Sequence, residues 1–405
     1  MNKEIRLGLR NNWKQFTLLV IVNSFVGGMV GLERSILPEL AELRFGLEAK
    51  TAIFSFIIIF GVSKAVTNYF MGAFADRYGR RRLLVLGWLI ALPIPFILIY
   101  APSWSWVVFA NLLLGINQGL TWSSTVVMKI DLVGKKDRGL AMGLNESAGY
   151  LAVGATAFLT GWIASEWGLI PYPFYLGIAL SLLGLFFSVF LIRDTVHHVE
   201  VESAGHSGGK LENVFWETTW KDRNLGSITQ AGLVNNLNDG MIWGLLPLIL
   251  SAAGFSISEI GLVAAIYPSV WGLGQLLTGR LADLLPKKSL LFWGMLLQGI
   301  CLLLMIPATG FSTYIILCAG LGIGTAMVYP TFLAGIAEYS APDQRAKSIG
   351  VFRLWRDLGY AIGALLTGIL ADFFGTGVSL GAIAGLTLLS SLIIKLRMQT
   401  TQESI

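Results

Sequence analysis

Long apolar segments alternate with short polar segments along the whole chain. Each apolar segment holds about 20 residues with few charges, the length that an α-helix needs to cross the hydrocarbon core of a bilayer. The pattern predicts about twelve such helices. We expect them at residues 16–38, 51–75, 83–101, 105–128, 140–164, 173–193, 227–251, 258–282, 289–308, 312–337, 347–372 and 377–396.

Composition strengthens this interpretation. Of 405 residues, 55% are hydrophobic and 13% are charged, whereas about 25% are charged in a typical soluble domain. A soluble core of this size could not bury so much apolar surface. We therefore expect an all-α integral membrane protein. The net charge of +5 lies in short runs between apolar segments, so we expect no nucleic-acid partner.

Basic residues occupy alternate connections between the predicted helices. The basic connections contain Arg77, Arg80, Arg81, Arg82, Lys135, Lys136, Arg138, Arg280, Lys287, Lys288, Arg345 and Lys347. The other connections contain only Arg44 and Lys50. Because cytoplasmic loops are enriched in Lys and Arg, we predict that both termini lie in the cytoplasm of a bacterial-type inner membrane. The N-terminal segment shows no cleavage site, which indicates an uncleaved first helix.

The two halves of the chain repeat one another. The matched positions are Val22-Asn23 with Val234-Asn235, Gly28-Met29 with Gly240-Met241, Pro38 with Pro247, residues 72–82 with 279–288, Arg138 and Gly143 with Arg345 and Gly350, and Gly149-Tyr150 with Gly359-Tyr360. Parallel repeats of six helices are a transporter architecture with its site between the repeats. We predict an N-terminal bundle over 1–193 and a C-terminal bundle over 227–405, joined by a cytoplasmic linker over 194–226.

The linker has a composition of its own. Residues 203–209 are typical of a flexible connection, and residues 213–223 could form an amphipathic helix on the membrane surface. His197, His198 and His206 lie in this linker; they could bind a metal, but we expect solvated loop histidines and no metal site. Cys301 and Cys318 fall inside apolar segments, so no disulfide framework is predicted.

The polar connection after the second predicted helix carries a recognisable motif. Its sequence over 72–82 is GAFADRYGRRR, and a weaker copy over 279–288 reads GRLADLLPKK. This motif resembles the signature of the major facilitator superfamily, at the place where that family keeps it. The motif positions are Gly72, Asp76, Arg77, Gly79, Arg80, Gly279 and Asp283.

The resemblance implies two six-helix bundles that rock around a central cavity. It also implies secondary, often proton-coupled, transport of a small solute without a cofactor. In the family, the aspartate that matches Asp76 faces the N-terminus of the eleventh helix, near residues 345–348. A carboxylate is favoured there by free N–H groups and the helix dipole, so this contact would latch the inward side shut.

Two positions depart from the drug–proton antiporters of that family. The fourth helix reads NLLLG at 111–115, without the arginine of R-x-x-x-G, and the fifth reads GYLAVG at 149–154, without the proline of G-P-x-x-G-G. The chain has no G-x-x-x-x-G-K-[ST] segment, H-E-x-x-H motif or nucleophile elbow. We therefore expect neither direct use of ATP nor an enzyme.

Eight ionisable residues fall within the predicted spans. They are Glu33, Glu146, Asp239 and Asp357, with Arg34, Lys64, Arg353 and Arg356. Each costs roughly 2.5–3.5 kcal/mol at the centre of a helix in lipid. They must face a wet cavity or one another, so two interpretations remain open: structural pairing, or a part in transport.

The resemblance places helices one, four, seven and ten around the cavity. The predicted cavity residues are Asn23, Gln118, Trp122, Asn235, Asn238, Arg353 and Arg356. Asp239, near the midplane, is the first candidate for a proton site and Glu146 the second, although a structural hydrogen bond between Asp239 and Asn23 is equally compatible with the sequence. Trp122 could stack on a substrate or pack in the core.

Other intramembrane charges have separate expected roles. Glu33 and Arg34 lie in the outer third of the first helix, where a place in the external gate suits them. Lys64 on the second helix is expected to approach Asp357 on the eleventh, because these helices meet between the bundles.

These observations favour a monomeric carrier for a small organic solute, driven by a proton gradient, with efflux slightly favoured. One alternative is an organic-anion or metabolite carrier in which Arg353 and Arg356 bind a carboxylate or phosphate. Another is a membrane receptor that keeps the fold and transports nothing.

Overall fold

The structure is a computed structural model of the 405-residue chain. It describes all residues except 1–6, 134–137, 196–197, 199–211, 341–343 and 400–405. Side chains are also left undescribed at 72–73, 75–77, 138–140, 283, 337 and 345–346. The linker residues 203–209, His197 and His206 therefore lie outside the described part of the chain.

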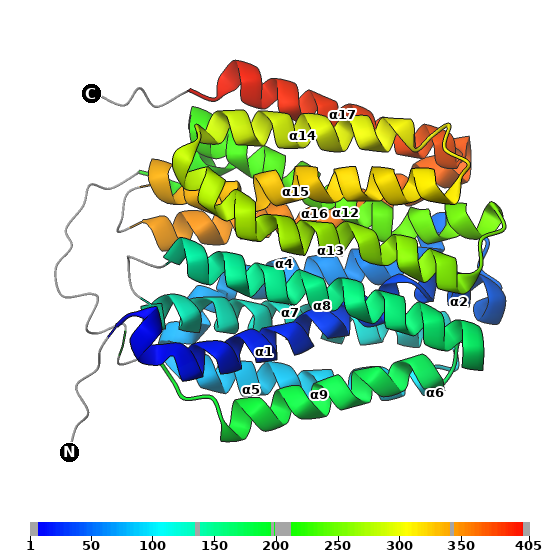
Figure 1. Ribbon diagram of the computed structural model, residues 1–405, viewed down its shortest axis with the longest axis horizontal. Helices are drawn as coiled ribbons and strands as arrows, with labels where there is room; N and C mark the ends of the chain where they lie inside the picture. The colour runs from blue at the N-terminus through cyan, green and yellow to red at the C-terminus, as the bar shows by residue number, and fades with distance from the viewer. Residues whose placement is uncertain (1–6, 134–137, 196–197, 199–211, 341–343, 400–405) are drawn as a thin grey trace.

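The described residues form helices and no strands (Figure 1). The N-terminal half contains α1 (Leu9–Arg34), α2 (Leu37–Phe45), α3 (Lys50–Ile53), α4 (Ser55–Tyr78), α5 (Arg80–Ala91), α6 (Pro93–Tyr100), α7 (Trp104–Val133), α8 (Arg138–Trp167) and α9 (Tyr172–Phe190). The C-terminal half contains α11 (Val214–Trp216), η1 (Glu217–Lys221), α12 (Arg223–Ala252), α13 (Ile257–Leu284), α14 (Lys287–Leu304), α15 (Phe311–Tyr339), α16 (Arg345–Phe374) and α17 (Thr376–Arg397).

Nine helical segments in the described part of the chain are long and apolar enough to cross a membrane. Three further long helices, α4, α7 and α12, run beside them (Figure 1). The polarity of α12 has an evident source, since it carries Asn235, Asn236, Asn238 and Asp239 with all four side chains buried. The predicted all-α, multi-pass membrane architecture is confirmed.

Prolines divide two of the predicted spans. The first breaks after Arg34 and resumes as α2, whose second residue is Pro38. The third breaks before α6, which begins at Pro93. Proline lacks the N–H that continues a helix but fits its first turn, so each proline starts a new helical segment with a changed direction.

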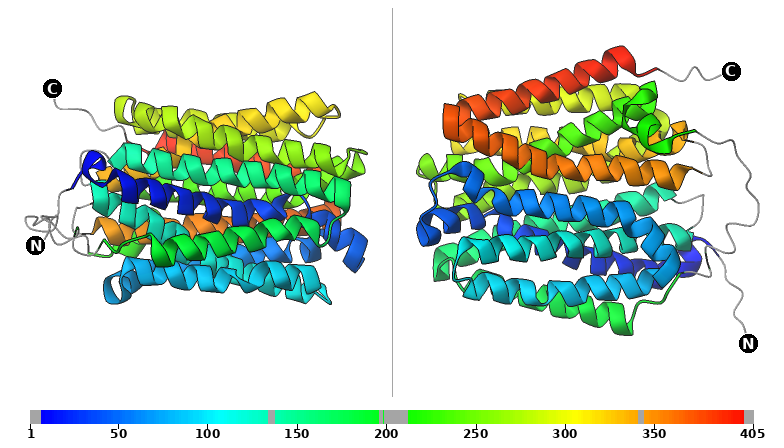
Figure 2. Two further views of the ribbon diagram at one scale, coloured as in Figure 1. Left: turned by 60° about the horizontal axis from the view of Figure 1, so that its bottom comes forward. Right: turned by 180° about the vertical axis from the view of Figure 1, so that it is seen from behind.

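The two halves pack side by side along two seams (Figures 1 and 2). One seam joins α8 to α13 and the other joins α4 to α16. Glycines let the backbones approach closely: a Cβ atom on Gly161 would lie 2.8 Å from the Cα of Gly261, and one on Gly61 would lie 2.7 Å from the amide nitrogen of Ala361. Such contacts exclude larger side chains at these positions.

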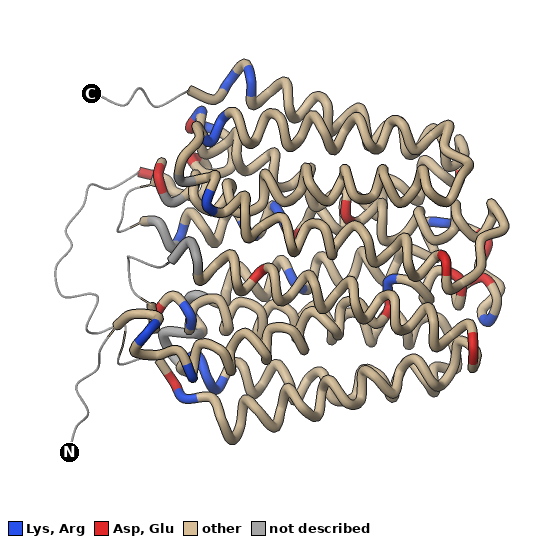
Figure 3. Tube along the Cα trace, viewed as in Figure 1, with Lys and Arg blue, Asp and Glu red and all other residues tan. Residues whose placement is uncertain are grey.

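Helix α1 begins and helix α17 ends at the same end of the helical bundle, and many lysines and arginines gather there (Figure 3). A smaller number of charged residues lie at middle depth between the helices (Figure 3). The direction in which the chain crosses the membrane stays a prediction that rests on this asymmetry.

The short helix expected over 213–223 is present, as α11 (Val214–Trp216) continuing directly into the π-helical turn η1 (Glu217–Lys221). Trp216 and Trp220 are exposed, whereas Thr218 is buried. The Trp355 indole of α16 donates to the hydroxyl of Thr219 (2.9 Å). The segment is thus held against the end of the bundle with two indoles directed outward, as in a membrane-interface anchor.

Candidate functional site

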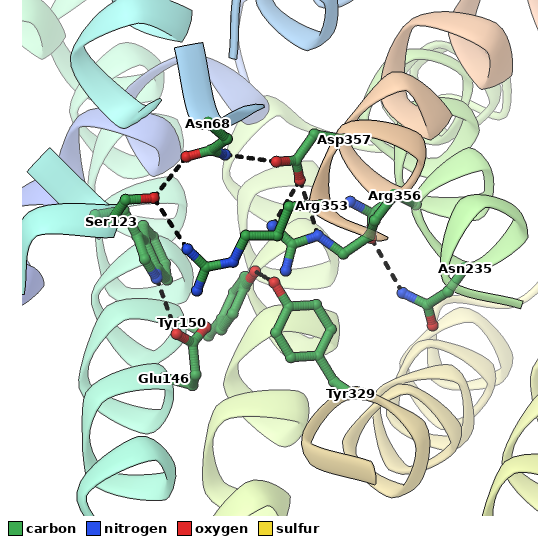
Figure 4. A network of polar contacts seen from close by, with 11 residues as sticks. Asn68, Ser123, Glu146, Tyr150, Asn235, Tyr329, Arg353, Arg356 and Asp357 are labelled. Carbon is green, nitrogen blue, oxygen red and sulfur yellow. Dashed lines mark hydrogen bonds and ion pairs between the residues drawn. The ribbon is translucent and has the colours of Figure 1, made fainter. Parts of the chain in front are cut away.

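A buried polar network lies between the two halves of the molecule (Figure 4). Its centre is Asp357 on α16, which accepts hydrogen bonds from Arg356 Nε (2.9 Å) and Nη2 (2.7 Å). Its other carboxylate oxygen accepts from Asn68 Nδ2 on α4 (2.5 Å). An intramembrane acid of the C-terminal half is thereby neutralised by its neighbour and linked to the N-terminal half.

The network continues across the interface to a second arginine. Ser123 on α7 donates to Asn68 Oδ1 (2.6 Å) and accepts from Arg353 Nη1 (3.2 Å). Arg353 Nε is buried and has no hydrogen-bond partner among the described residues. Unlike Arg356, Arg353 has no carboxylate within ion-pair distance in that part of the chain.

Lys64 approaches Asp357 closely enough for the two charges to interact, as expected, but the two form no direct ion pair, because Arg356 and Asn68 occupy the carboxylate. The Lys64 ammonium lies instead among aromatic rings. It is 5.0 Å from the ring centroid of Tyr360, 5.4 Å from that of Phe60 and 5.7 Å from that of Trp122. Desolvated cation–π contacts of this kind stabilise a buried ammonium without removing its charge.

Glu146 joins the network from α8. One of its oxygens accepts from the Trp122 indole (2.9 Å) and from Asn145 Nδ2 (2.8 Å), while the other has no partner among the described residues. The ammonium of the fully buried Lys129 donates to Asn145 Oδ1. Lys129 was missed from sequence because the predicted helix ended at residue 128, whereas α7 continues to Val133.

Aromatic side chains close the space between α8, α13 and α15. The rings of Tyr150 and Trp271 stack with centroids 3.5 Å apart. The Tyr150 hydroxyl donates to that of Tyr329 (3.2 Å), so both contacts cross between the halves (Figure 4). The sequence motifs did not indicate Tyr329 or Trp271; the signal available was an aromatic residue deep in a predicted span.

Asp239 lies apart from this network, on α12. The Tyr267 hydroxyl of α13 donates to Asp239 Oδ1 and lies 3.2 Å from the hydroxyl of Thr325. Asp239 Oδ2 is buried with no hydrogen-bond partner among the described residues. The alternative bond to Asn23 is not formed, because Asn23 donates to the Asn145 carbonyl (2.7 Å).

The amides predicted to line the cavity mostly hold helices together within one half. Gln118 donates to the Val26 carbonyl (2.9 Å). Asn238 donates to Gln298 Oε1 (3.1 Å) and accepts from Thr387 (2.7 Å). Asn23 also accepts from Thr125 (2.9 Å), and Asn235 donates to Asn236 (3.3 Å). Asn23 and Asn238 thus use both ends of their amides within one half, whereas Gln118 Oε1 and Asn235 Oδ1 are buried without a hydrogen-bond partner among the described residues.

Glu33 and Arg34 do not form an ion pair with each other. Both are buried, and the Arg34 guanidinium has no hydrogen-bond partner among the described residues. The Arg34 guanidinium lies 4.1 Å from the ring centroid of Trp243 and 5.0 Å from that of Phe60. Since Trp243 belongs to the other half, this contact bridges the halves on the side of the network away from the termini.

The signature motif surrounds the turn between α4 and α5. Gly79 there has φ 83°, a backbone conformation that glycine adopts without strain. Arg80 packs against Asp131 of α7, with Nε 3.3 Å from a carboxylate oxygen. The backbones of Gly72, Asp76 and Arg77 lie in α4 and those of Gly279 and Asp283 in α13, but the side chains of Asp76, Arg77 and Asp283 are outside the described set, so the predicted latch is not tested.

Two bacterial proteins are similar to this chain in sequence over nearly its whole length. "Multidrug resistance protein 2" of Bacillus subtilis (strain 168) is 23% identical over 375 residues, covering 89% of this chain and 90% of that protein. "Proton-coupled antiporter flippase LtaA" of Staphylococcus haemolyticus (strain JCSC1435) is 23% identical over 387 residues, covering 90% and 89%.

A solved structure and a family model agree with these relatives. The human organic anion transporter MFSD10 (TETRAN) superposes with a TM-score of 0.71 at 15% identity, over 95% of this chain and 99% of that one, and so shares the fold. The model of the Major Facilitator Superfamily matches residues 18–231 and again 228–404. Two successive matches agree with the internal repeat, and the chain belongs to the Major Facilitator Superfamily.

Proposed function

We propose that this transporter exports a small organic anion in exchange for protons. The observation that carries the proposal is the excess of cations in the central network. Asp357 is committed to Arg356, so two carboxylates, Glu146 and Asp239, are left to balance the three cations Lys64, Lys129 and Arg353. Buried cations that lack partners are costly, so this space favours a ligand that brings negative charge.

The groups around these cations suit a carboxylate attached to a flat apolar body. Arg353 offers a guanidinium held by one hydrogen bond to Ser123, and a guanidinium fork matches a carboxylate in two-point contact. The rings of Trp122 and Tyr150 pack against each other at the same interface, with ring centroids 5.2 Å apart. Of the two arginines named from sequence, Arg353 is the proposed ligand-binding group and Arg356 its structural neighbour.

The proton step is assigned to Asp239. Burial favours its neutral form, and the Tyr267 hydroxyl can donate to the ionised form. Exchange of an anion outward for a proton inward moves positive charge into the cell. An inside-negative potential assists such a step by about 2.3 kcal/mol per charge for each 100 mV. The printed names of two relatives, a multidrug resistance protein and a proton-coupled antiporter, support this direction.

The test of substrate charge uses three aromatic probes of similar size: benzoate, benzylamine and benzamide, with naphthoate as a larger acid. Purified protein should show a rise in melting temperature with the acids that exceeds the rise with the amine or amide, because binding to the native state stabilises it. Arg353→Gln should abolish the difference, whereas Arg223→Gln, an exposed arginine at the end of the bundle, should keep it. Equal stabilisation by benzylamine would contradict an anionic substrate.

Movement of a labelled acid into proteoliposomes separates a carrier from a receptor with the same fold. Inside-out vesicles energised with a proton gradient should accumulate the acid that gives the largest thermal shift. Binding without any flux would favour the receptor.

A further inference from the structure

A second polar feature lies on the outer surface of the N-terminal half, away from the interface between the halves. A cavity of about 530 Å³ opens between the start of α5 and the end of α9. It is lined by Arg81, Arg82, Val85, Leu86, Leu89, Val189 and Asp194. Both helices lie at the edge of the bundle in Figure 1, at the end that holds the termini, so this cavity faces the surrounding bilayer.

The cavity has an apolar wall and a basic mouth. Leu86 and Leu89 are 46% and 49% exposed, although the transport pathway does not use them. They lie four and seven residues after Arg82, and this spacing places all three on one face of α5. Seven residues of helix span roughly 10 Å, a length along which the first part of an acyl chain can lie.

The two arginines are not equivalent. Arg81 Nε donates to the Ser188 carbonyl (3.4 Å), and its Nη2 donates to the Val189 carbonyl at the end of α9. These bonds fix the Arg81 guanidinium where two carbonyl groups need donors. Arg82 is exposed and has no ion-pair or hydrogen-bond partner among the described residues. Arg82 is therefore the cation available to a ligand.

The single carboxylate in the lining, that of Asp194, is bound to the backbone of α5. Asp194 accepts from the backbone N–H of Arg81 (3.1 Å), the second residue of α5, and so caps the start of that helix. Arg193, beside it, has its backbone N–H bound by Gln15 of α1 (2.9 Å). The lining itself holds two arginines and one aspartate, so its net charge is positive.

We propose that this cavity binds an anionic phospholipid of the leaflet on the side of the termini. The phosphate would contact Arg82, and an acyl chain would lie along Val85, Leu86 and Leu89. Charge complementarity and the apolar wall together favour a lipid over a free anion, because a free phosphate gains nothing from the leucines. This site is distinct from the transport site and does not depend on what the protein transports.

The test is native mass spectrometry of the full-length protein in micelles doped with equal amounts of phosphatidylglycerol and phosphatidylcholine. The wild type should retain phosphatidylglycerol preferentially. Arg82→Gln should lower that preference by about fivefold, in line with the contribution of one basic residue at an anionic surface. Arg223→Gln, an exposed arginine outside the cavity, is the matched control and should leave the preference unchanged.

Two further measurements distinguish a bound phospholipid from a bound free anion. Leu86→Ser should lower retention of phosphatidylglycerol while Arg82 is intact, and inorganic phosphate should fail to displace the bound lipid. Displacement by phosphate would mean a bare anion site and would overturn the proposal. Equal retention of the two lipids by the wild type, or an undiminished preference in Arg82→Gln, would also overturn it. Size-exclusion profiles and melting temperatures identify any variant that fails to fold.

Discussion

Asp239 is the predicted proton site that lies outside the central network. One of its carboxylate oxygens accepts from Tyr267, and the other is buried without a hydrogen-bond partner among the described residues. We predict that Asp239→Asn folds and inserts normally but no longer accumulates substrate against a gradient, because an amide cannot take up and release the proton. Exchange of substrate without a gradient should survive. Paired uptake and counterflow assays in proteoliposomes measure both properties.

A mutant that retained wild-type uptake would exclude Asp239 as the coupling residue, and Glu146 would then become the better candidate. Tyr267→Phe serves as a companion variant: it removes the hydroxyl that donates to Asp239 but keeps the ring. It should shift the pH dependence of uptake rather than abolish uptake.

The neighbouring arginines of α16 should respond differently to substitution. Arg353→Gln should raise the Kd for the transported acid by about tenfold or more, since a hydrogen bond to a charged group contributes about 1.5–3 kcal/mol. Arg356→Gln leaves Asp357 buried without its ion-pair partner, and should lower the free energy of unfolding by about 3–5 kcal/mol. Ligand titration and thermal unfolding of both variants distinguish the roles; the reverse pattern would contradict the assignment.

Sequence reasoning at this scale identified which residues carry charge but not how they pair. Lys64 and Asp357 lie on the helices expected to meet, yet the acid is taken by Arg356, one residue away. Pairing depends on side-chain direction and reach, which a one-dimensional pattern does not contain. For the same reason Asn23 and Gln118 lie on the predicted helices but bind backbone carbonyls within their own half.

At the scale of elements, a contact joins the halves at the end opposite the termini. Asp372, near the end of α16, accepts from the backbone N–H groups of Lys50 (2.5 Å) and Thr51 (3.0 Å) at the start of α3. A carboxylate in this position satisfies free N–H groups and interacts favourably with the helix dipole. This contact should favour the state in which that end is closed.

We therefore predict that Asp372→Ala makes that end open more often. A cysteine at Phe54, which is fully buried against the other half beside Gly244, should react about fivefold faster with a thiol reagent, since a capping contact contributes about 1 kcal/mol. Glu48→Ala, an exposed acid at the same end, is the control. An unchanged reaction rate in Asp372→Ala would show that the contact does not bias closure. The analogous contact of Asp76 with the start of α16 stays a prediction.

Every element expected from hydrophobic periodicity is present, and the errors concern where the elements end. Helices α7, α15 and α16 extend beyond their apolar segments, because polar residues near the bundle ends still satisfy their backbone groups by continuing the helix. The breaks before α2 and α6 occur at prolines that are visible in the sequence. Hydropathy alone does not reveal such a break, because the apolar segment continues across it.

At the scale of the whole molecule, the distribution of basic residues predicts which end of the bundle faces the cytoplasm. In a variant that lacks the two buried cysteines, Cys301 and Cys318, a cysteine at Ser207 should not react with an impermeant reagent added to intact cells. A cysteine at Thr309, exposed at the opposite end of the bundle, should react. The opposite labelling pattern would reverse the predicted topology.

The overall architecture could be predicted because it follows from few constraints. Apolar length sets the helices, the internal repeat sets the two halves, and the signature motif identifies the family. The relative placement of the halves could not be predicted, because it depends on close backbone contacts such as Gly154 beside Ala265 and Gly61 beside Ala361. Many glycines of the sequence do not make such contacts, so residue type alone does not locate a seam.

The glycine seams also bear on electrical insulation. A carrier that moves in an energised membrane must not let a file of water form between its halves, since protons would then leak along it. At Gly161 and Gly261 the two backbones lie too close for a water molecule to pass between them. Gly161→Leu would force them apart. Cells that express this variant should hold a lower membrane voltage even without substrate, and a voltage-sensitive dye would detect the loss.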